Sequence, residues 1–520
     1  MKPLKKRLIS WDSFILLLLL SQCIYYGYQN ILPLEPQSRH VWRQSDGASY
    51  AWNYATQSTN FFEPRMNNLA LNGNGKVATE FPIIYYASGM IYRLIGVHPW
   101  IHRLINISIL FFGLFSFYQM IDEIFHSKFW AIILPMFLFT TPLLVFYSNN
   151  FLPDVPAFAL SIAASYYFFR YSQTKLRSTY RLSLYLFALA ALIKLSYLLV
   201  FFSLIFLFIL ERNPIRKYRI LTGDACLFHE KNSKHITSFA LLTGAVLSWY
   251  IYASWYSTQT LIQHFFSVIS STPQDEQISF GQILRFVFAK IQEDFFILSI
   301  NHFWILFLSL GILFGLGKNP KIFRICFSLL LAGILLYLYL FRNNINGHDY
   351  YFTPLFLLLI PVYLYAAHLM ESYAKDKKIK LYLQGFIVFI LLLNIQNAKM
   401  EMQYCYYGNQ FHYQEKETFY KEEFRNYLLE KGVKKDSKII SYPDPSMNNT
   451  LYLMRRRGWS SLGIARMDAD FVTQLKTEGA EFLILNDTTY RQDSLLIPAL
   501  GNRIGSFEGI DIYDLSELHW

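Results

Sequence analysis

Long apolar runs recur along most of this chain. The first, "SFILLLLLSQCIYYGYQNIL", covers residues 13–32. A helix needs roughly 20 apolar residues to cross the hydrocarbon of a bilayer, so this run is long enough to span. No small-residue cleavage site follows it and further runs do, so we interpret it as an uncleaved first helix rather than a signal peptide. Ten more apolar runs cover 102–121, 129–148, 155–170, 182–193, 196–210, 236–256, 299–317, 322–341, 351–370 and 381–396.

Segment 80–97, "EFPIIYYASGMIYRLIGV", is a twelfth candidate. It carries Arg93 and is rich in tyrosine, so a helix lying in the membrane interface is an equal alternative. Loops rich in lysine and arginine stay in the cytoplasm. A cytoplasmic N-terminus with an interfacial 80–97 places nearly all basic short loops inside, whereas a spanning 80–97 would place the later ones outside. We therefore predict eleven spans.

This topology exports three segments. Residues 33–101 form a large first exported loop, 257–298 form an amphipathic exported segment, and the tail from about residue 397 is exported as well. The first two belong to a transmembrane domain that covers residues 1–396.

The hydrophobic pattern changes in the tail. "YKEEFRNYLLEKGV" has helical spacing, and "DADFVTQLKTEGA" predicts a helix that ends at Gly479. "KIISY" and "EFLILN" predict short strands, and "GIDIYDL" alternates as a strand does. Helices alternating with strands predict a small exported α/β domain over 397–520. The tail carries no glycine motif of the kind that cradles phosphate.

Composition agrees with a membrane protein. Only 16% of the 520 residues are charged, whereas a soluble domain carries about a quarter. The net charge of +11 would suggest nucleic acid in a soluble protein. Here the basic residues cluster in short loops, so topology explains the charge and no nucleic-acid partner is expected. The four cysteines are scattered, which argues against a disulfide framework.

Charged groups near a bilayer are costly and tend to mark function. The predicted topology places several of them at the exported face: Arg39, Arg43, Asp46, Glu80, Asp154, Lys194, His348 and Asp349, with Tyr350 beside them.

Each of these groups also has a simpler explanation. Asp154 could begin a helix, where the helix dipole favours a carboxylate. Lys194 could snorkel to the headgroups. His348 and Asp349 could cap the next helix, Glu80 could be a turn residue, and the arginines could bind lipid phosphate. A site is favoured because one topology, derived without these residues, places all of them on one face.

Carboxylates and cations at such a face suit transfer of a sugar from a lipid-linked phosphosugar. As the anomeric C–O bond breaks, negative charge grows on the departing polyprenyl phosphate, where Arg, Lys or a divalent cation would stabilise it. The sugar becomes oxocarbenium-like. A carboxylate can take the proton of the acceptor hydroxyl. One base without a protein nucleophile predicts a single displacement with inversion.

Three segments in this order resemble glycosyltransferase family 39: "WRQSDGASYAWNYA" followed by "FFEP", then "TEFPIIYYASGMIYRLIGV", then "NNFLPDVPAFAL". That family includes the protein O-mannosyltransferases, the lipid A aminoarabinose transferases and the bacterial Rgt-type glycosyltransferases. The resemblance covers the membrane part of the chain. It implies the GT-C fold and a polyprenyl-phosphate sugar donor.

The resemblance also implies roles for single residues. Asp46 matches the catalytic base of the first exported loop, and Asp154 matches a second acidic residue, so the resemblance makes Asp46 and Asp154 the candidate catalytic residues. Glu80-Phe81-Pro82 matches an acidic-x-Pro segment, in which some relatives carry a basic residue where this chain has Phe81. The donor-phosphate role would then fall to Arg43 or Lys194.

The remaining candidates complete the predicted site. Glu80, His348, Asp349 and Tyr350 are candidate donor- or substrate-binding residues. Metal dependence differs among relatives, so a divalent ion is left open. Asp46, Asp154 and His348 are its candidate ligands if the fold brings them together.

The sequence therefore predicts an inverting glycosyltransferase of the bacterial cytoplasmic (inner) membrane. It would transfer a sugar to a hydroxyl of a glycan, lipid or protein. A lipid-linked sugar flippase or transporter and an O-antigen-type polymerase are the alternatives. Transporters bind near the bilayer midplane, often in broken helices, whereas the polar groups here lie at span ends. Polymerases centre on arginine-rich exported loops.

Overall fold

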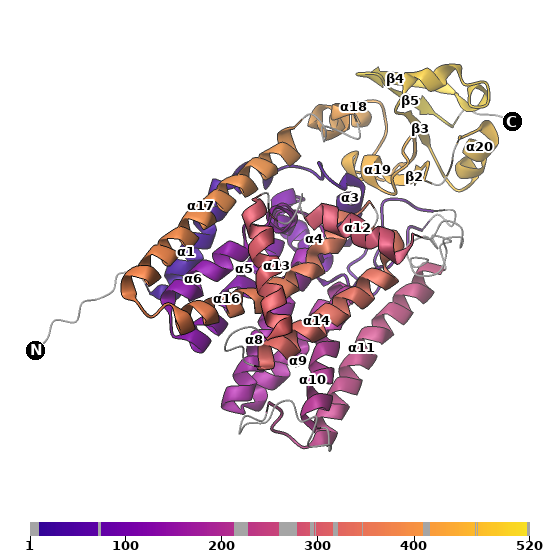
Figure 1. The fold of residues 1–520 in the computed structure, drawn as a ribbon. Coiled ribbons are helices and arrows are strands. Elements are labelled where there is room, and N and C mark those ends of the chain that lie inside the picture. The colour runs from indigo at the N-terminus through magenta and orange to yellow at the C-terminus, as the bar shows by residue number, and fades with distance from the viewer. Residues whose placement is uncertain are drawn as a thin grey trace, which may run out of the picture.

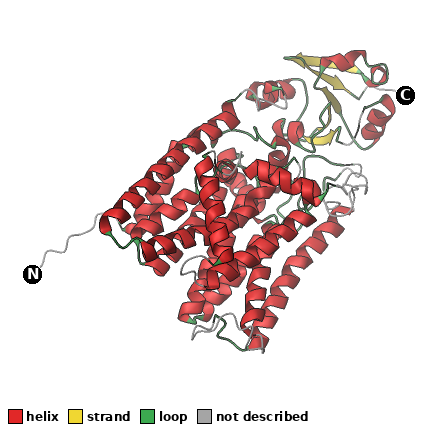
Figure 2. Ribbon diagram, viewed as in Figure 1, coloured by secondary structure: helices red, strands yellow, loops and turns green. Residues whose placement is uncertain are grey.

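The computed structural model describes residues 10–70, 74–212, 227–258, 278–291, 296, 298–315, 321–345, 347–408, 416–462, 464 and 466–516. A bundle of helices makes up most of the protein, and a small domain with a β-sheet lies at one end of it (Figure 1). Helix α17 (Lys377–Tyr407) runs along the bundle and leads to that domain. Within the described residues, all strands belong to this C-terminal domain (Figure 2).

Every predicted apolar run coincides with one helix or with two consecutive helices. These are α1 (Trp11–Tyr25) with α2 (Tyr28–Ile31), α5 (Pro99–Phe125), α6 (Lys128–Leu138) with α7 (Pro142–Ser148), α8 (Asp154–Thr174), α9 (Arg177–Ile193), η1 (Leu195–Tyr197) with α10 (Leu198–Arg212), α11 (Asn232–Thr258), α13 (Ser299–Phe314), α14 (Lys321–Leu340), η7 (Asp349–Leu358) with α16 (Leu359–Tyr373), and α17. The short helix α15 (Arg342–Ile345) precedes η7.

Length and hydropathy qualify fewer of these helices as membrane spans. Among the described residues, six helices are long and apolar enough to cross a bilayer, or seven if the α6–α7 pair, bent by 77°, counts as one. The helical membrane architecture is confirmed, and the count of eleven stays a prediction. Of the predicted segment 257–298, the described part contains α12 (Phe280–Lys290).

The α8–α9 hairpin sets the geometry of the site. The two helices are joined by a short turn, so the first residue of α8 and the residue after α9 lie at the same end. On its other side α8 packs closely on α5, where a Cβ at Gly113 would lie 2.6 Å from the carbonyl oxygen of Ala159. Small residues allow this approach of two helix backbones. The hairpin thereby places Asp154 next to Lys194.

The first loop contains two helices, α3 (Val41–Thr56) and α4 (Ile83–Ile95). Helix α4 has 13 residues, about 20 Å, which is short of the roughly 30 Å hydrocarbon core. The interfacial alternative for 80–97 agrees with this length. Helix α3 was not predicted, because residues 39–54 show no apolar period of their own.

Helix α3 is buried on most of its surface. Twelve of its 16 residues are buried, and it packs tightly on α4, where a Cβ at Gly89 would lie 2.7 Å from the carbonyl oxygen of Ala51. A helix enclosed on several sides needs no single apolar stripe, so periodicity does not reveal it.

The C-terminal domain has a five-stranded sheet in the order β2-β1-β3-β5-β4. Strands β1, β2 and β3 are parallel, and β5 is antiparallel to both β3 and β4. The elements are α18 (Glu422–Glu430), β1 (Lys438–Tyr442), α19 (Asn449–Leu453), β2 (Arg457–Ser460), α20 (Ala469–Thr477), β3 (Phe482–Leu485), β4 (Asn502–Phe507) and β5 (Ile510–Asp514).

The three predicted strands are β1, β3 and β5, and the two predicted helices are α18 and α20. Strands β2 and β4 were not predicted. The division placed between 396 and 397 falls inside α17, which continues to Tyr407.

The first loop covers the edge of this sheet. Strand β2 is an edge strand, and its Gly458 donates its N–H to the carbonyl of Asn67 (3.0 Å) and accepts from the N–H of Leu69 (2.7 Å). An uncovered edge is a template for unwanted pairing. Here backbone hydrogen bonds hold the C-terminal domain against the loop that carries α3.

Candidate functional site

An ion pair joins the two helices of the first loop. Arg43 lies in the first turn of α3, and its Nη2 contacts Oε1 of Glu80, just before α4. Tyr85 donates its hydroxyl to the same carboxylate oxygen. The Arg43 side chain is 16% exposed and that of Glu80 10%. Nη1 of Arg43 is buried and has no hydrogen-bond partner among the described residues, so the guanidinium keeps a donor for a ligand.

A second ion pair lies at the end of the α8–α9 hairpin. Nζ of Lys194 is 2.9 Å from Oδ1 of Asp154, whose side chain is 1% exposed. Within the described part of the chain neither carboxylate oxygen of Asp154 has a partner in hydrogen-bond geometry. Lys194 also lies over the rings of Tyr350 (5.1 Å) and Tyr351 (4.8 Å). Its ammonium therefore turns toward these groups rather than snorkelling to the headgroups.

Asp46 lies on the same face of α3 as Arg43, three residues further on. It is 6% exposed, and its Oδ1 accepts a hydrogen bond of 2.8 Å from Nδ2 of Asn448 in the C-terminal domain. Burial raises the pKa of Asp46 to about 6, although Arg43 and Asn448 act in the opposite direction. A carboxyl with this pKa is ionised at neutral pH and still basic enough to accept a proton.

Electrostatics connect these groups into one site. Arg43 interacts with Glu80, Asp46 and Tyr350, and Asp154 interacts with Lys194, Arg43 and Glu80. The structure thus brings together six of the predicted residues, which come from separate segments of the chain: Arg43, Asp46, Glu80, Asp154, Lys194 and Tyr350.

The two carboxyls nearest Arg43 have different protonation properties. Burial raises the pKa of Glu80, but the charges of Arg43 and Lys194 and the hydrogen bond from Tyr85 outweigh it, and the pKa is lowered to about 2. The pKa of Asp46 is about 6. A separation of two carboxyl pKa values of this kind is typical of acid–base sites. It favours Asp46 over Glu80 as the candidate base, since Glu80 is paired with Arg43.

This separation predicts a pH profile. If ionised Asp46 is required, kcat/KM should rise about tenfold per pH unit below its pKa and level off above about pH 6. Glu80 should contribute no step between pH 4 and 9, since it is ionised throughout. Steady-state rates of the purified protein across this range would test the expectation, and a profile without an acidic limb would contradict it.

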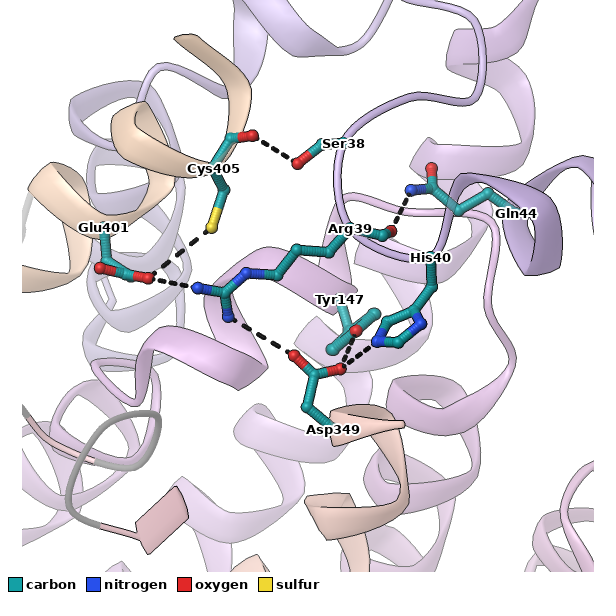
Figure 3. Close-up of polar contacts among 8 residues, drawn as sticks. All are labelled: Ser38, Arg39, His40, Gln44, Tyr147, Asp349, Glu401 and Cys405. Atoms are coloured by element: carbon teal, nitrogen blue, oxygen red, sulfur yellow. Dashed lines mark hydrogen bonds and ion pairs between the residues drawn. The ribbon is translucent and has the colours of Figure 1, made fainter. Parts of the chain in front are cut away.

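Asp349, next to Tyr350 in the chain, belongs to a different network of polar contacts (Figure 3). Asp349 accepts from the hydroxyl of Tyr147, its Oδ1 lies 2.9 Å from Nε2 of His40, and its Oδ2 lies 3.4 Å from Nη1 of Arg39. Nη2 of Arg39 contacts Glu401 of α17 at 2.6 Å. We call Arg39, His40, Tyr147, Asp349 and Glu401 the anchor cluster, because it fixes the start of α3 to α7, η7 and α17.

The anchor cluster changes the interpretation of two candidates. Asp349 is engaged by three side chains of this cluster, which favours a structural role over direct substrate binding. The ring of His348 contacts those of His40 (5.3 Å between ring centroids) and Tyr350 (5.5 Å) in tilted arrangements, and His40 contacts Tyr350 directly (5.1 Å). His348 therefore contacts a ring of the anchor cluster and a ring of the site.

Removing Arg39 should loosen this attachment. Arg39→Met would leave the mostly buried carboxylates of Asp349 and Glu401 without their shared cation. We expect a loss of about 1.5–3 kcal/mol in stability, as for a hydrogen bond to a charged group. Thermal unfolding in detergent would measure it. Arg39→Lys is the control: it keeps the charge but cannot bridge two carboxylates with a planar fork, so an intermediate loss is expected. An unchanged unfolding temperature for Arg39→Met would contradict the anchoring role.

Among the described residues, Asp46, Asp154 and His348 are not gathered into one group of candidate metal ligands. Among the described residues there is no group of three or more His, Cys, Asp or Glu side chains that could hold a metal ion. Asp46 faces Asn448, Asp154 faces Lys194, and His348 contacts aromatic rings. The ammonium of Lys194 lies 2.9 Å from Oδ1 of Asp154.

Two contributors to the site were missed in the sequence. Tyr85, five residues after Glu80, carries no signal beyond the general abundance of tyrosine. Asn448 lies 402 residues from Asp46 in a domain without a recognisable motif, so no local pattern could have identified it.

Comparison with known proteins supports the resemblance seen in the sequence. Residues 79–223 match the family model described as dolichyl-phosphate-mannose-protein mannosyltransferase. This segment contains Glu80, Asp154 and Lys194, whereas Asp46 precedes it. Among curated proteins, none matches the sequence significantly.

Solved structures match over nearly the whole chain. ArnT from Cupriavidus metallidurans in the apo state has a TM-score of 0.60 and 11% identity, covering 96% of this chain and 98% of that chain. ArnT bound to undecaprenyl phosphate has a TM-score of 0.60 and 10% identity, covering 98% and 99%. Arabinofuranosyltransferase AftD from Mycobacteria has a TM-score of 0.54 and 12% identity, covering 98% of this chain and 42% of that chain. The predicted GT-C fold is confirmed.

Proposed function

We propose that this membrane protein of the GT-C fold is an inverting glycosyltransferase that uses a polyprenyl-phosphate sugar. The observation that carries the proposal is the position of Asp46 on one face of α3 with Arg43, a basic carboxylate beside a buried guanidinium that keeps an unpartnered donor. The undecaprenyl phosphate bound to ArnT supports the class of donor. The active face would be the exported face of the bacterial inner membrane.

The residues suggest a single displacement. Asp46 takes the proton from the acceptor hydroxyl as its oxygen attacks the anomeric carbon from the side opposite the phosphate. The C–O bond to the phosphate breaks, and its electron pair leaves with the polyprenyl phosphate. Buried cations stabilise the charge that develops on this leaving group more strongly than water would. The products are the glycosylated acceptor with inverted configuration, protonated Asp46 and polyprenyl phosphate.

Arg43 and Lys194 are the cations for the phosphate. Glu80 holds Arg43, and Asp154 holds Lys194 at the end of the hairpin. Each cation therefore has an anionic partner that fixes its position before the donor arrives. This arrangement supplies positive charge in a chain that has Phe81 where some relatives carry a basic residue.

One feature favours a second candidate, a lipid-linked sugar flippase. The break between α6 and α7, with its 77° bend, is of the kind found in transporters. However, α7 supplies Tyr147 to the anchor cluster, so the bend also has a structural use.

Reconstituted protein would decide between the two functions. Proteoliposomes containing a panel of labelled polyprenyl-phosphate sugars should release polyprenyl phosphate and form a glycosylated lipid or glycan. Movement of label across the bilayer without release would favour the flippase. Mass spectrometry of surface glycans and lipids, with and without this protein in cells, would then identify the sugar and the acceptor.

A further inference from the structure

The C-terminal domain reaches the base proposed above through one side chain. Asn448 is fully buried, and its Nδ2 donates to Oδ1 of Asp46 at 2.8 Å. Nδ2 also lies 3.2 Å from Sδ of Met66. Among the interactions described for Asp46, this is the one that the C-terminal domain contributes.

The orientation of the Asn448 amide follows from its other partner. Its Oδ1 accepts from the backbone N–H of Asn68 at 3.0 Å and from the hydroxyl of Ser49 at 3.4 Å. A backbone N–H can only donate, so the oxygen must face Asn68 and the NH₂ must face Asp46. The polarity of the contact with Asp46 is therefore determined independently of Asp46 itself.

The side chain of Asn448 does not cap its own helix. Asn448 is the N-cap residue of α19, where an asparagine normally accepts from the first amides of its own helix, yet its side chain makes no such bond. Asp444 and Ser446 accept from those amides instead, through Thr450 N (3.2 Å) and Asn449 N (2.9 Å). The side chain of Asn448 is thereby free to face α3.

The docking of the domain holds this side chain in place. Ser45 donates to Oδ1 of Asn449 (2.7 Å), and Asn68 donates to the carbonyl of Met447 (3.0 Å). Ala48 and Trp52 of α3 pack in one apolar cluster with residues of the domain, among them Leu451. Contacts from the first loop and contacts within the C-terminal domain thus both fix the position of Asn448 relative to Asp46.

We propose that the C-terminal domain completes the site, with Asn448 as a positioning residue that holds the Asp46 carboxylate in its ionised form and in the orientation that accepts the proton of the acceptor hydroxyl. The inference rests on the proposed function only in the role given to Asp46. A hydrogen bond to the charged form of an acid favours that form. Loss of the donor should therefore make Asp46 harder to ionise.

The chain offers a matched pair of variants. Asn448→Asp keeps the oxygen that accepts from Asn68 and replaces only the NH₂ that faces Asp46. Asn449→Asp introduces the same charge at the adjacent buried residue, where Nδ2 has no hydrogen-bond partner among the described residues. Asn448→Ala and Asn449→Ala repeat the comparison without added charge, and cover the case in which a buried carboxylate prevents folding.

Two readouts are measured on the full-length protein in detergent. One is the acidic limb of kcat/KM. The other is the pKa of Asp46 itself, measured by infrared difference spectroscopy. The band of the protonated Asp46 carboxyl is identified as the one that is lost in Asp46→Asn. We expect Asn448→Asp to raise the apparent pKa in both measurements by about one to three pH units, and Asn448→Ala to raise it less. At pH 7 a pKa raised from about 6 by one to three units lowers the ionised fraction of Asp46, and with it kcat, by about two- to a hundredfold, with little change in donor KM.

The outcomes separate the two proposals. Shifts in the Asn448 variants that clearly exceed those in the matched Asn449 variants support the positioning role. Equal shifts within each pair, or no shift in either Asn448 variant, overturn it, since a merely structural contact would alter stability alone. If the infrared pKa of Asp46 shifts as expected but the protein transfers no sugar, the effect of Asn448 on Asp46 is supported and the proposed function is refuted.

Discussion

Asp46→Asn is expected to lower the rate of sugar transfer by about 10²–10⁴-fold, the usual contribution of a general base. The substitution is nearly isosteric, and its amide oxygen can still accept from Asn448. It removes only the capacity to take a proton. Donor affinity should therefore remain close to wild type, because Arg43 and Lys194 keep their partners.

Single-turnover transfer and equilibrium binding of the donor measure these two effects separately. Asp349→Asn is the matched control, since it also removes a mostly buried carboxylate but from the anchor cluster. It should lower the unfolding temperature and leave the acidic limb of the pH profile in place. Turnover of Asp46→Asn at the wild-type rate would exclude Asp46 as the base.

Lys194→Met should have the largest effect on stability. It removes one member of a buried ion pair and leaves Asp154, which is 1% exposed, without its partner. Breaking such a pair from one side costs about 3–5 kcal/mol, because an uncompensated charge remains buried. Loss of the cation should also raise the KM for the donor.

A second substitution separates the two effects. Lys194→Met combined with Asp154→Leu removes both charges, and replacing a buried pair by apolar side chains is often neutral or stabilising. We expect the double variant to regain most of the unfolding temperature while the donor KM stays high. Recovery of both properties would show that Lys194 balances Asp154 and does not bind the donor.

The helices of the membrane part could be predicted from the hydrophobicity of consecutive residues. Each apolar run coincides with a helix because length and hydropathy are properties of contiguous residues. Strands β1 and β3 were predicted as short runs rich in apolar and β-branched residues, and β5 was predicted from its alternation of apolar and polar residues. Strands β2 and β4 were missed: "RGWS" and "NRIGSF" are polar and contain glycine, and pairing with neighbouring strands decides their conformation.

Several candidate site residues could be predicted from the sequence because charged residues stand out among long apolar runs. Asp154 and Lys194 interrupt or flank long apolar runs, and the hairpin between them made a common location predictable. What could not be predicted is which cation pairs with which acid. That Arg43 pairs with Glu80, and that Asp349 belongs to the anchor cluster, depends on how α3, α4 and η7 pack.

The sequence by itself determined that this is a helical membrane protein, that its tail is an α/β domain, and that acids and bases gather at the ends of its spans. These features follow from the periodicity and polarity of neighbouring residues. Only the tertiary structure decided that α3 is a helix, that Asn448 donates to Asp46, and that the pKa is raised for Asp46 but lowered for Glu80. The reason is physical: burial, ion pairing and hydrogen bonding arise between residues far apart in the chain, and they set the conformation of α3 and the two pKa values together.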